Sequence, residues 1–500
     1  MPEYLRSLLI ILVLSTAFFS FAGRSASAII GRDHFVTRRN LWFELTLAAF
    51  LAQNFWIYTF IAVLLLLRAN RRETNSPALF FFILFAVPVA FAKIPGFGLI
   101  NFFFDLSHAR ILALFILLPA YYSLIRQNST LSFGRTGPDK LLLAYLFLTA
   151  ALNLRDSSIT DTLRQIFYLF MDVFLPYFVI SRSLKNIQAF KDALMSLVLA
   201  IMLVALIAVF ESFKHWLLYE SLLTVLGLTQ GMTGYLARDG FLRVTSSAGF
   251  PISLGYLMTV GLGIYLFLQR SIERKFLRRL GMALLSAGLI VPLSRGPWVG
   301  AVLLFVVFIV TGRSPVKHLM SLAMAGILSL TLIAMLPGGE RIINLLPYIG
   351  TTEKHNIDYR EDLVTNSIIV IQRNPWFGSV NYFEAPEMKA LFANGMIDVV
   401  NTYIGLALDS GFVGLGLFVG FFALVVLLLY RAMHSLRDKD SEEYLLGRAL
   451  LATLLAILLM IVTVSSITVI PIVYWSVAGL CVAYRQMVKQ SFAEVSKPHL

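Results

Sequence analysis

Three arginines on separate parts of this sequence stand beside long apolar segments. Arg243 precedes a run of small and hydroxyl-bearing residues at 244–249, Arg295 separates two apolar runs, and Arg360 lies in the charged segment 358–362. A guanidinium group stays charged and binds phosphate oxygens in a bidentate manner without a metal ion. We therefore expect the three side chains to suit a lipid-linked pyrophosphate.

Each arginine also has a plainer interpretation, which the sequence leaves open. Arg360 could pair with the neighbouring carboxylates at a helix start. Arg295 could reach up to lipid phosphates from a tight turn formed by Gly296 and Pro297. Arg243 could mark an ordinary junction between a loop and a helix.

Composition identifies the environment of these residues. Of the 500 residues 58% are hydrophobic and 14% are charged, and uninterrupted apolar runs occur at 197–210 and 299–310. A soluble core cannot bury so much apolar surface, so the sequence predicts a polytopic membrane protein. The net charge of +13 comes from Lys and Arg in short loops between apolar runs, a pattern typical of membrane topology signals rather than of nucleic-acid binding.

No cofactor is expected from the sequence. Cys481 is the single cysteine and lies in an apolar run, which excludes internal disulfides and cysteine metal clusters. The seven histidines show no metal-ligand spacing, and no glycine motif for nucleotides stands in a suitable context.

The apolar runs predict an all-α, polytopic transmembrane helical bundle with about 12 to 14 transmembrane helices. We expect N-terminal transmembrane helices over 1–212 and central transmembrane helices over 213–336, with an outer loop at 213–248. A large extracytoplasmic loop with short amphipathic helices is expected at 337–399, and C-terminal transmembrane helices at 400–500. The expected spans are 7–23, 48–67, 77–92, 111–125, 141–154, 165–181, 193–212, 249–268, 280–294, 297–311, 318–336, 411–430, 449–466 and 468–484.

The distribution of Lys and Arg predicts that the amino terminus is cytoplasmic. One loop disagrees, because this topology places Arg24, Arg32, Arg38 and Arg39 outside. The first span is followed by small residues at 25–28 that resemble a signal-peptide cleavage site, although we expect a retained helix.

The large loop contains one clear helix signal. Val364, Ile368 and Ile371 recur at helical spacing and predict an amphipathic helix on the membrane surface, with Arg360 just before it. The segment 374–378, with its proline and glycine, should end that helix.

Several short motifs, in this order, resemble the O-antigen ligase and Wzy-type polysaccharide polymerase superfamily of bacterial membrane glycosyltransferases. The resemblance covers roughly 240–430. The motifs are Ser294-Arg295-Gly296, Tyr359-Arg360 with Leu363, Asn374-Pro375-Trp376-Phe377-Gly378, and Asn401 followed by Gly411-Phe412-Val413-Gly414.

This resemblance implies a metal-independent glycosyltransferase that acts on undecaprenyl-pyrophosphate-linked glycans at the periplasmic face of the bacterial inner membrane. Arg295 and Arg360 would bind the pyrophosphate and stabilise its developing charge, with Arg243 as a third contact. Membrane lipids and a chain-length regulator protein are the other expected partners, and no nucleic acid is expected.

In the ligases the pattern is a His-Asn pair, followed after nine residues by Gly-x-x-Gly. One position of this sequence departs from it. Asn401, Gly411 and Gly414 match, but the histidine position is Val400, which cannot accept a proton. Asp398 is the first candidate for the base, although it could equally cap a helix, and His355 and Asp409 are the next candidates. The missing histidine favours a polymerase of surface polysaccharide (exopolysaccharide or O-antigen) over a ligase.

Two alternatives remain open at the level of sequence. One is an O-antigen ligase that transfers finished glycan to lipid A core or to a protein. The other is a glycolipid flippase or transporter, because Asp172 is a carboxylate inside an expected span.

Overall fold

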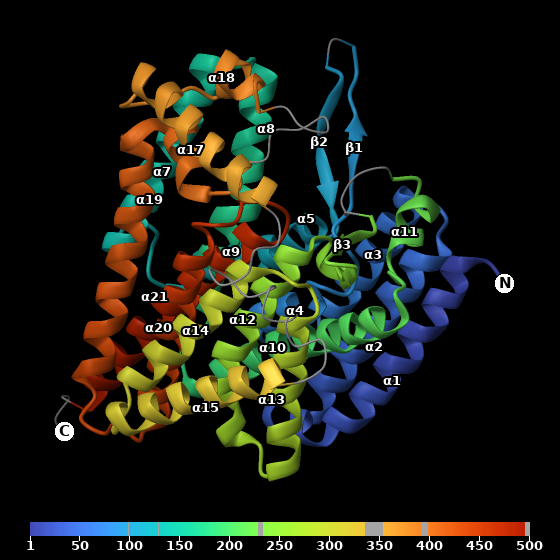
Figure 1. Cartoon of the computed structure of the whole chain (residues 1–500), viewed down its shortest axis with the longest axis vertical. Helices are drawn as coiled ribbons and strands as arrows, with labels where there is room; N and C mark the ends of the chain where they lie inside the picture. Colours follow the sequence, from blue (N-terminus) through green and yellow to red (C-terminus); the bar gives the residue numbers. More distant parts are fainter. Residues whose placement is uncertain (99, 129, 229–233, 336–353, 392–398, 496–500) are drawn as a thin grey trace.

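The computed structural model describes residues 1–98, 100–128, 130–228, 234–335, 354–391 and 399–495, and within them helices predominate (Figure 1). The first half contains α1 (Glu3–Ile30), α2 (Arg32–Leu51), α3 (Phe55–Asn70), α4 (Ser76–Ile83), β1 (Phe91–Pro95), β2 (Phe102–Ser107), α5 (His108–Leu112), α6 (Leu118–Arg126), α7 (Gly137–Asp156), α8 (Ile159–Leu169), α9 (Leu175–Ser183), α10 (Ile187–Lys214) and α11 (Glu220–Val225). The second half contains β3 (Leu236–Arg238), β4 (Phe241–Arg243), α12 (Pro251–Leu268), α13 (Lys275–Ile290), α14 (Arg295–Val310), α15 (Pro315–Met335), α17 (Lys354–Arg373), α18 (Pro386–Lys389), α19 (Thr402–Ser435), α20 (Glu442–Met460) and α21 (Ile470–Val495).

The helices form the predicted all-α polytopic bundle. In the described part of the chain, seven helices are long and apolar enough to cross a membrane, and three shorter apolar helices accompany them. The helices α10 and α12 are apolar on all sides and almost entirely buried, as expected for helices at the centre of a bundle. The remaining helices surround this centre.

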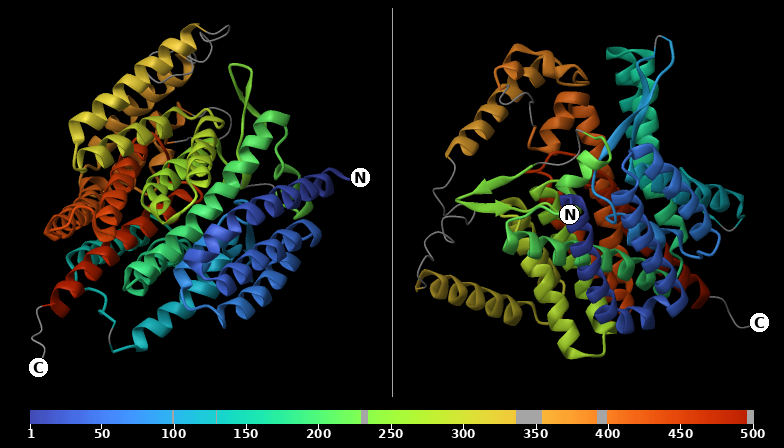
Figure 2. Two further views of the ribbon diagram at one scale, coloured as in Figure 1. Left: turned by 90° about the horizontal axis from the view of Figure 1, so that it is seen from below. Right: turned by 90° about the vertical axis from the view of Figure 1, so that its right-hand side faces the viewer.

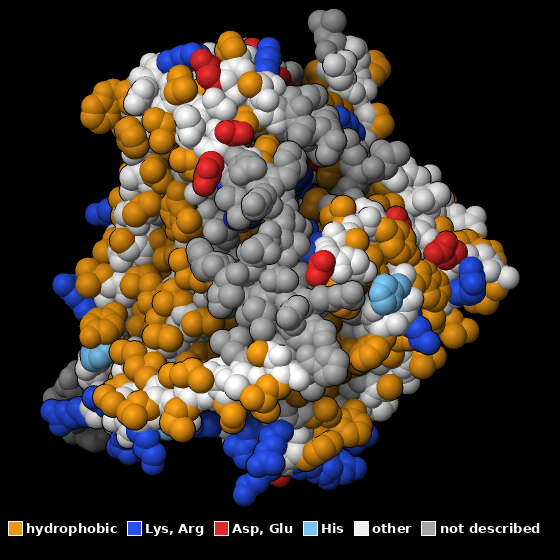
Figure 3. All heavy atoms as spheres, viewed as in Figure 1, with side chains coloured by type: hydrophobic (Ala, Val, Ile, Leu, Met, Phe, Trp, Pro, Cys, Tyr) orange, Lys and Arg blue, Asp and Glu red, His pale blue; other side chains and the backbone are white. Residues whose placement is uncertain are grey.

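One end of the bundle is rich in basic residues. Figure 3 shows Lys and Arg side chains gathered along the lower rim of the molecule. Ion pairs connect helix ends at this rim: Lys191 with Glu442 at 2.7 Å, and Arg313 with Asp440. Because Arg313 follows the carboxyl end of α14, the amino end of α14 lies toward the opposite face of the bundle.

The predicted orientation of the first span is wrong. The indole of Trp216 donates a hydrogen bond to Glu3 at 2.9 Å, so the amino end of α1 lies beside the predicted outer loop. The other end of α1 carries Arg24, which lines the same surface depression as Arg274 at the basic rim. The four arginines that contradicted the predicted topology therefore belong to the basic face.

The cause is a helix that hydropathy does not reveal. The helix α2 crosses back from the basic face, although it contains charged residues along its length. Its Arg38 is fully buried and bonds to Glu73 at 2.8 Å and to both oxygens of Asp192. Two carboxylates neutralise this buried cation, which is the condition for placing it inside the bundle.

Two other features differ from the prediction. The expected span at 77–92 is helical only as far as Ile83, where α4 ends, and the chain continues into the antiparallel hairpin β1–β2 that projects from the top of the molecule (Figure 1). A second small hairpin, β3–β4, was also not predicted. Short connections at 291–294 and 461–469 separate α13 from α14 and α20 from α21.

Candidate active site

The turn at 291–294 brings two of the three predicted arginines together. Arg243, at the end of β4, donates a hydrogen bond of 3.4 Å to the hydroxyl of Ser294 and a long one of 3.5 Å to the carbonyl of Pro292. Arg238 in β3 donates to the carbonyl of Leu293, whose φ of +51° makes the turn tight. The hairpin thus holds the residue that directly precedes Arg295.

The tight turn lies before Arg295 and not at Gly296 and Pro297, as the sequence had suggested. Arg295 is the first residue of α14, and Gly296 and Pro297 belong to the first helical turn. A helix amino terminus carries a partial positive charge, so α14 adds to the positive potential of the two arginines.

A turn rich in buried hydroxyls follows Arg243. Thr245, Ser246 and Ser247 are buried, and their side-chain oxygens have no hydrogen-bond partner within the described part of the chain. An unpaired buried polar group costs about 1 to 3 kcal/mol. These hydroxyls could donate hydrogen bonds to an anion beside Arg243.

A buried carboxylate in α10 fixes this turn. Glu211 accepts hydrogen bonds from the backbone N–H of Ser246 at 2.9 Å and of Leu218 at 3.0 Å. Ser246 has a φ of +46°, an unusual conformation for a residue with a side chain. Glu211 therefore connects the centre of the bundle to the strained turn beside Arg243.

The turn at 461–469 joins the amino ends of α14 and α19. A Cβ atom on Gly296 would lie 2.5 Å from the hydroxyl of Thr463, so α14 approaches this turn closely. Thr402 donates its backbone N–H to the carbonyl of Ile461 at 3.0 Å and its hydroxyl to that of Val464 at 2.7 Å. Gly296, the residue after Arg295, and the start of α19 thus approach one short segment.

The asparagine of the motif acts as a helix cap. The side-chain oxygen of Asn401 accepts from the backbone N–H groups of Tyr403 at 2.9 Å and Ile404 at 3.1 Å. Val400 is half-buried just before it. Asp398 and the side chain of His355 lie outside the described residues, so the structure places only Asp409, in α19, among the three candidate bases.

The long helix α19 is interrupted at Gly411. Gly411 has φ +64° and ψ −169° inside α19. The segment 374–378 docks into this break, since Phe412 donates to the carbonyl of Pro375 at 2.7 Å and Val413 to that of Trp376 at 3.1 Å. Two sequence motifs separated by more than thirty positions therefore form one backbone unit.

The helix of the large loop begins earlier than predicted and buries a different face. The helix α17 starts at Lys354, so Arg360 lies inside it, on an exposed position, and not before it. Leu363 and Val370 are buried, whereas Val364 and Ile368 are exposed. Val364 and Ile368 of the predicted membrane-facing stripe are thus left exposed, while Leu363 and Val370 pack against other segments of the loop. The helix ends at Arg373, as segment 374–378 predicted.

Arg360 lies on the same face of the bundle as Arg295. The buried residues of α17 form a small core with Met388 and Leu391 of the α18 region and with Val399 and Leu408 at the start of α19. In the right-hand view of Figure 2 the hairpin β3–β4 lies at a level between α17 and α18 above and α15 below. Arg243 is thus held directly at the turn 291–294 that precedes Arg295. Arg360 belongs to residues 354–391, which pack on the start of α19 and are called the cap below.

Sequence reasoning missed the residues that attach this cap. Asp156, the last residue of α7, accepts from the backbone N–H of Val380 at 3.0 Å, and Arg155 donates to the carbonyl of Gly378 at 2.9 Å. The hydrogen bond from Arg155 lowers the pKa of Asp156 below its ordinary value. An adjacent Arg-Asp pair after an apolar run was the only signal in the sequence.

Asp172, the basis of the transporter alternative, has a partner. Its carboxylate pairs with Arg110 at 2.7 Å, and Arg110 also donates to the carbonyl of Asp105 at 2.7 Å. This network joins the base of the β1–β2 hairpin to the helix that contains Asp172. Among the described residues, no group of three or more His, Cys, Asp or Glu side chains is arranged to hold a metal ion.

The fold and this site define a multi-pass α-helical membrane protein with a polar, arginine-bearing region at one face. Residues 280–419, from α13 into α19, match the protein family described as O-Antigen ligase, which confirms the resemblance over that part of the chain and supports an O-antigen ligase or polymerase type of membrane enzyme. No curated protein matches the chain. The matched region contains Arg295, Arg360, Asn401 and Gly411.

Proposed function

We propose that this protein is an inner-membrane polymerase of surface polysaccharide. It moves a growing glycan from its undecaprenyl-pyrophosphate carrier to a hydroxyl of the next lipid-linked repeat unit. The observation that carries the proposal is the contact of Arg243 with the turn that leads into Arg295. The turn and Arg295, though not Arg243, lie in the region that matches O-antigen ligases.

The basic rim supports the proposed orientation. Lys and Arg are enriched on the cytoplasmic side of membrane proteins, so the rim in Figure 3 corresponds to the cytoplasm. Arg295 then belongs to the periplasmic face, where a lipid-linked glycan would be used.

In this proposal the arginines provide electrostatic catalysis. As the bond between the sugar and the pyrophosphate breaks, negative charge develops on the phosphate oxygens. Arg295 and Arg360 bind those oxygens, and Arg243 and the amino end of α14 add positive potential. Removal of one such donor typically costs about 3 to 4 kcal/mol of transition-state stabilisation.

The acceptor hydroxyl requires a base, and Val400 cannot serve. Asp398 remains our first proposal, because it stands two residues before the position that the ligases fill with histidine. Asp409 is the alternative within the described residues, since its backbone lies beside Gly378 in the unit that joins α17 to α19.

A ligase is the second candidate, and the description of the matched family favours it. It would use the same donor site and transfer finished glycan to lipid A core or to a protein. The valine at position 400 is the observation that favours the polymerase. A chain-length regulator is the partner that we propose for the polymerase.

Product analysis in a deletion strain tests this proposal. Complementation with the wild-type gene should restore long glycan on the undecaprenyl carrier, whereas Arg295→Ala or Arg360→Ala at equal membrane abundance should leave single repeat units. Arg279→Ala, on the exposed basic rim, is the matched control and should restore long chains. Long glycan on a new anchor would instead identify a ligase, and unchanged chain lengths in both site variants would refute both assignments.

A further inference from the structure

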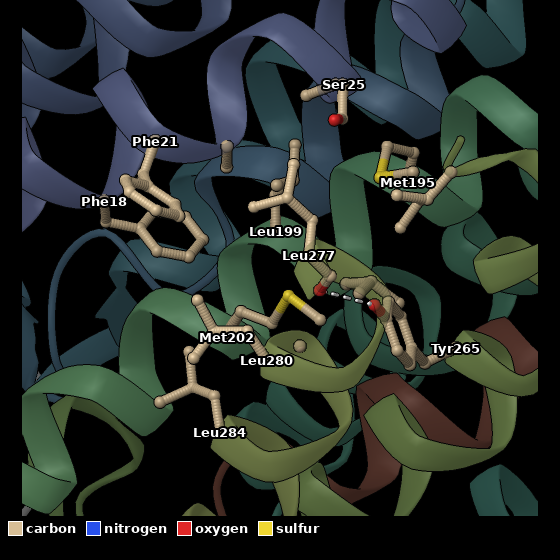
Figure 4. Close-up of a pocket in the computed structure, with 15 residues that line it drawn as sticks. Phe18, Phe21, Ser25, Met195, Leu199, Met202, Tyr265, Leu277, Leu280 and Leu284 are labelled. Carbon is tan, nitrogen blue, oxygen red and sulfur yellow. Dashed lines mark hydrogen bonds between the residues drawn. The ribbon is translucent and has the colours of Figure 1, made fainter. Parts of the chain in front are cut away.

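A second candidate binding site lies in a pocket between α1, α10, α12 and α13, at the basic end of the bundle. Its cavity volume is about 110 Å³, and apolar side chains from all four helices line it. Figure 4 shows Phe18 and Phe21 of α1 facing Met202 of α10 and Leu284 of α13 across this space.

The pocket offers almost no polar group to a ligand. Its polar side chains are Ser25 and Tyr265, and the hydroxyl of Tyr265 already donates to the carbonyls of Arg278 at 3.0 Å and Leu277 at 3.5 Å (Figure 4). An occupant must therefore present an apolar chain.

The mouth of the pocket is cationic. A second depression, lined by Arg24 and Arg274, shares Phe21, Ser25 and Leu277 with the first. Both arginines are exposed, and neither forms an ion pair with a described residue, although Glu273 adjoins one of them. Apolar space thus continues directly into a site for an anion.

We infer that this pocket binds an anionic phospholipid, with an acyl chain between α1 and α13 and the headgroup phosphate between Arg24 and Arg274. Guanidinium groups bind phosphate through paired hydrogen bonds, and basic pockets between transmembrane helices bind anionic headgroups. The site lies at the end of the bundle opposite to Arg295, so it is separate from the proposed site for the glycan donor.

Native mass spectrometry of the full-length protein in detergent tests the inference, with dioleoyl phosphatidylglycerol and dioleoyl phosphatidylcholine as competing probes. The wild type should retain phosphatidylglycerol preferentially. The preference should fall roughly 30-fold in the double variant Arg24→Ala and Arg274→Ala, because each basic residue near an anionic lipid surface strengthens binding about five- to sixfold.

Two further variants separate this site from general surface charge. Ala22→Phe leaves both arginines in place but fills the pocket, so it should lower retention of both lipids even if the double variant fails to fold. Arg279 is exposed on α13, the helix that Arg274 directly precedes, and lines neither depression. Arg279→Ala should therefore leave the retention of both lipids unchanged. An unchanged preference in the double variant, or an equal loss in Arg279→Ala, would overturn the inference. It would also be overturned if the occupant proved to be a polyprenyl phosphate or a second copy of the chain.

Discussion

Arg243 donates a hydrogen bond to the hydroxyl of Ser294, the residue that directly precedes Arg295. This contact connects a hairpin from one loop to the first turn of α14. It means that one arginine orients the turn that presents another.

We predict that Arg243→Ala will shorten the polysaccharide strongly and that Arg243→Lys will restore it only in part. Lysine keeps the charge but cannot form paired hydrogen bonds to phosphate or to the turn. Loss of one donor of this kind lowers turnover by about 100- to 1,000-fold. Gel analysis of glycan chain length at equal protein abundance measures the effect, and full restoration by lysine would show that only charge matters.

Replacement of Gly411 should disrupt the cap. In Gly411→Ala the new Cβ would lie 2.3 Å from the carbonyl carbon of Trp376, and the backbone conformation there is almost restricted to glycine. We expect a destabilisation of at least about 1 to 3 kcal/mol and loss of activity.

The matched control for this prediction is Gly416→Ala, five residues further along the same helix, where nothing lies within 4 Å of an added Cβ. Thermal unfolding in detergent should show a lower melting temperature for the Gly411 variant alone. Equal melting temperatures for the two variants would mean that segment 374–378 does not depend on this break.

The sequence predicted the stop after Arg373 because the proline and glycine of segment 374–378 act locally on the backbone. It did not predict α2, since the burial of Arg38 depends on Glu73 and Asp192, which come from distant segments. It also did not predict the buried face of α17, because Leu363 packs against residues far along the chain. The arginines were found from their chemistry, whereas Arg155 and Asp156 become visible only once their partners at 378–381 are placed.

The attachment of the cap should depend on pH. The pKa of Asp156 is lowered in the folded protein by the hydrogen bond from Arg155. The stabilisation is therefore fully present above the ordinary pKa of an aspartate and is lost as the pH falls through the lowered value. Asp156→Ala should reduce the melting temperature at pH 7, and its difference from the wild type should shrink as the pH falls below about 4. A difference that grows on acidification would contradict this account.

Arg38→Ala should destabilise the protein far more than Arg39→Ala. Arg38 is fully buried between two carboxylates, whereas the guanidinium of Arg39 donates to the neighbouring Asn40 on the surface. Removal of one partner from a buried ion pair costs about 3 to 5 kcal/mol. Chemical denaturation of the two variants in detergent measures the difference, and similar stabilities would exclude a structural role for the Arg38 network.

The most direct test of the arginine site is the affinity of the purified protein for undecaprenyl pyrophosphate, measured for the wild type, Arg295→Ala and Arg360→Ala. If both side chains bind the diphosphate, each variant should bind at least about tenfold more weakly, equivalent to about 1.4 kcal/mol, while Arg279→Ala binds like the wild type. Wild-type affinity in either site variant would contradict the claim that these arginines from separate segments share one pyrophosphate.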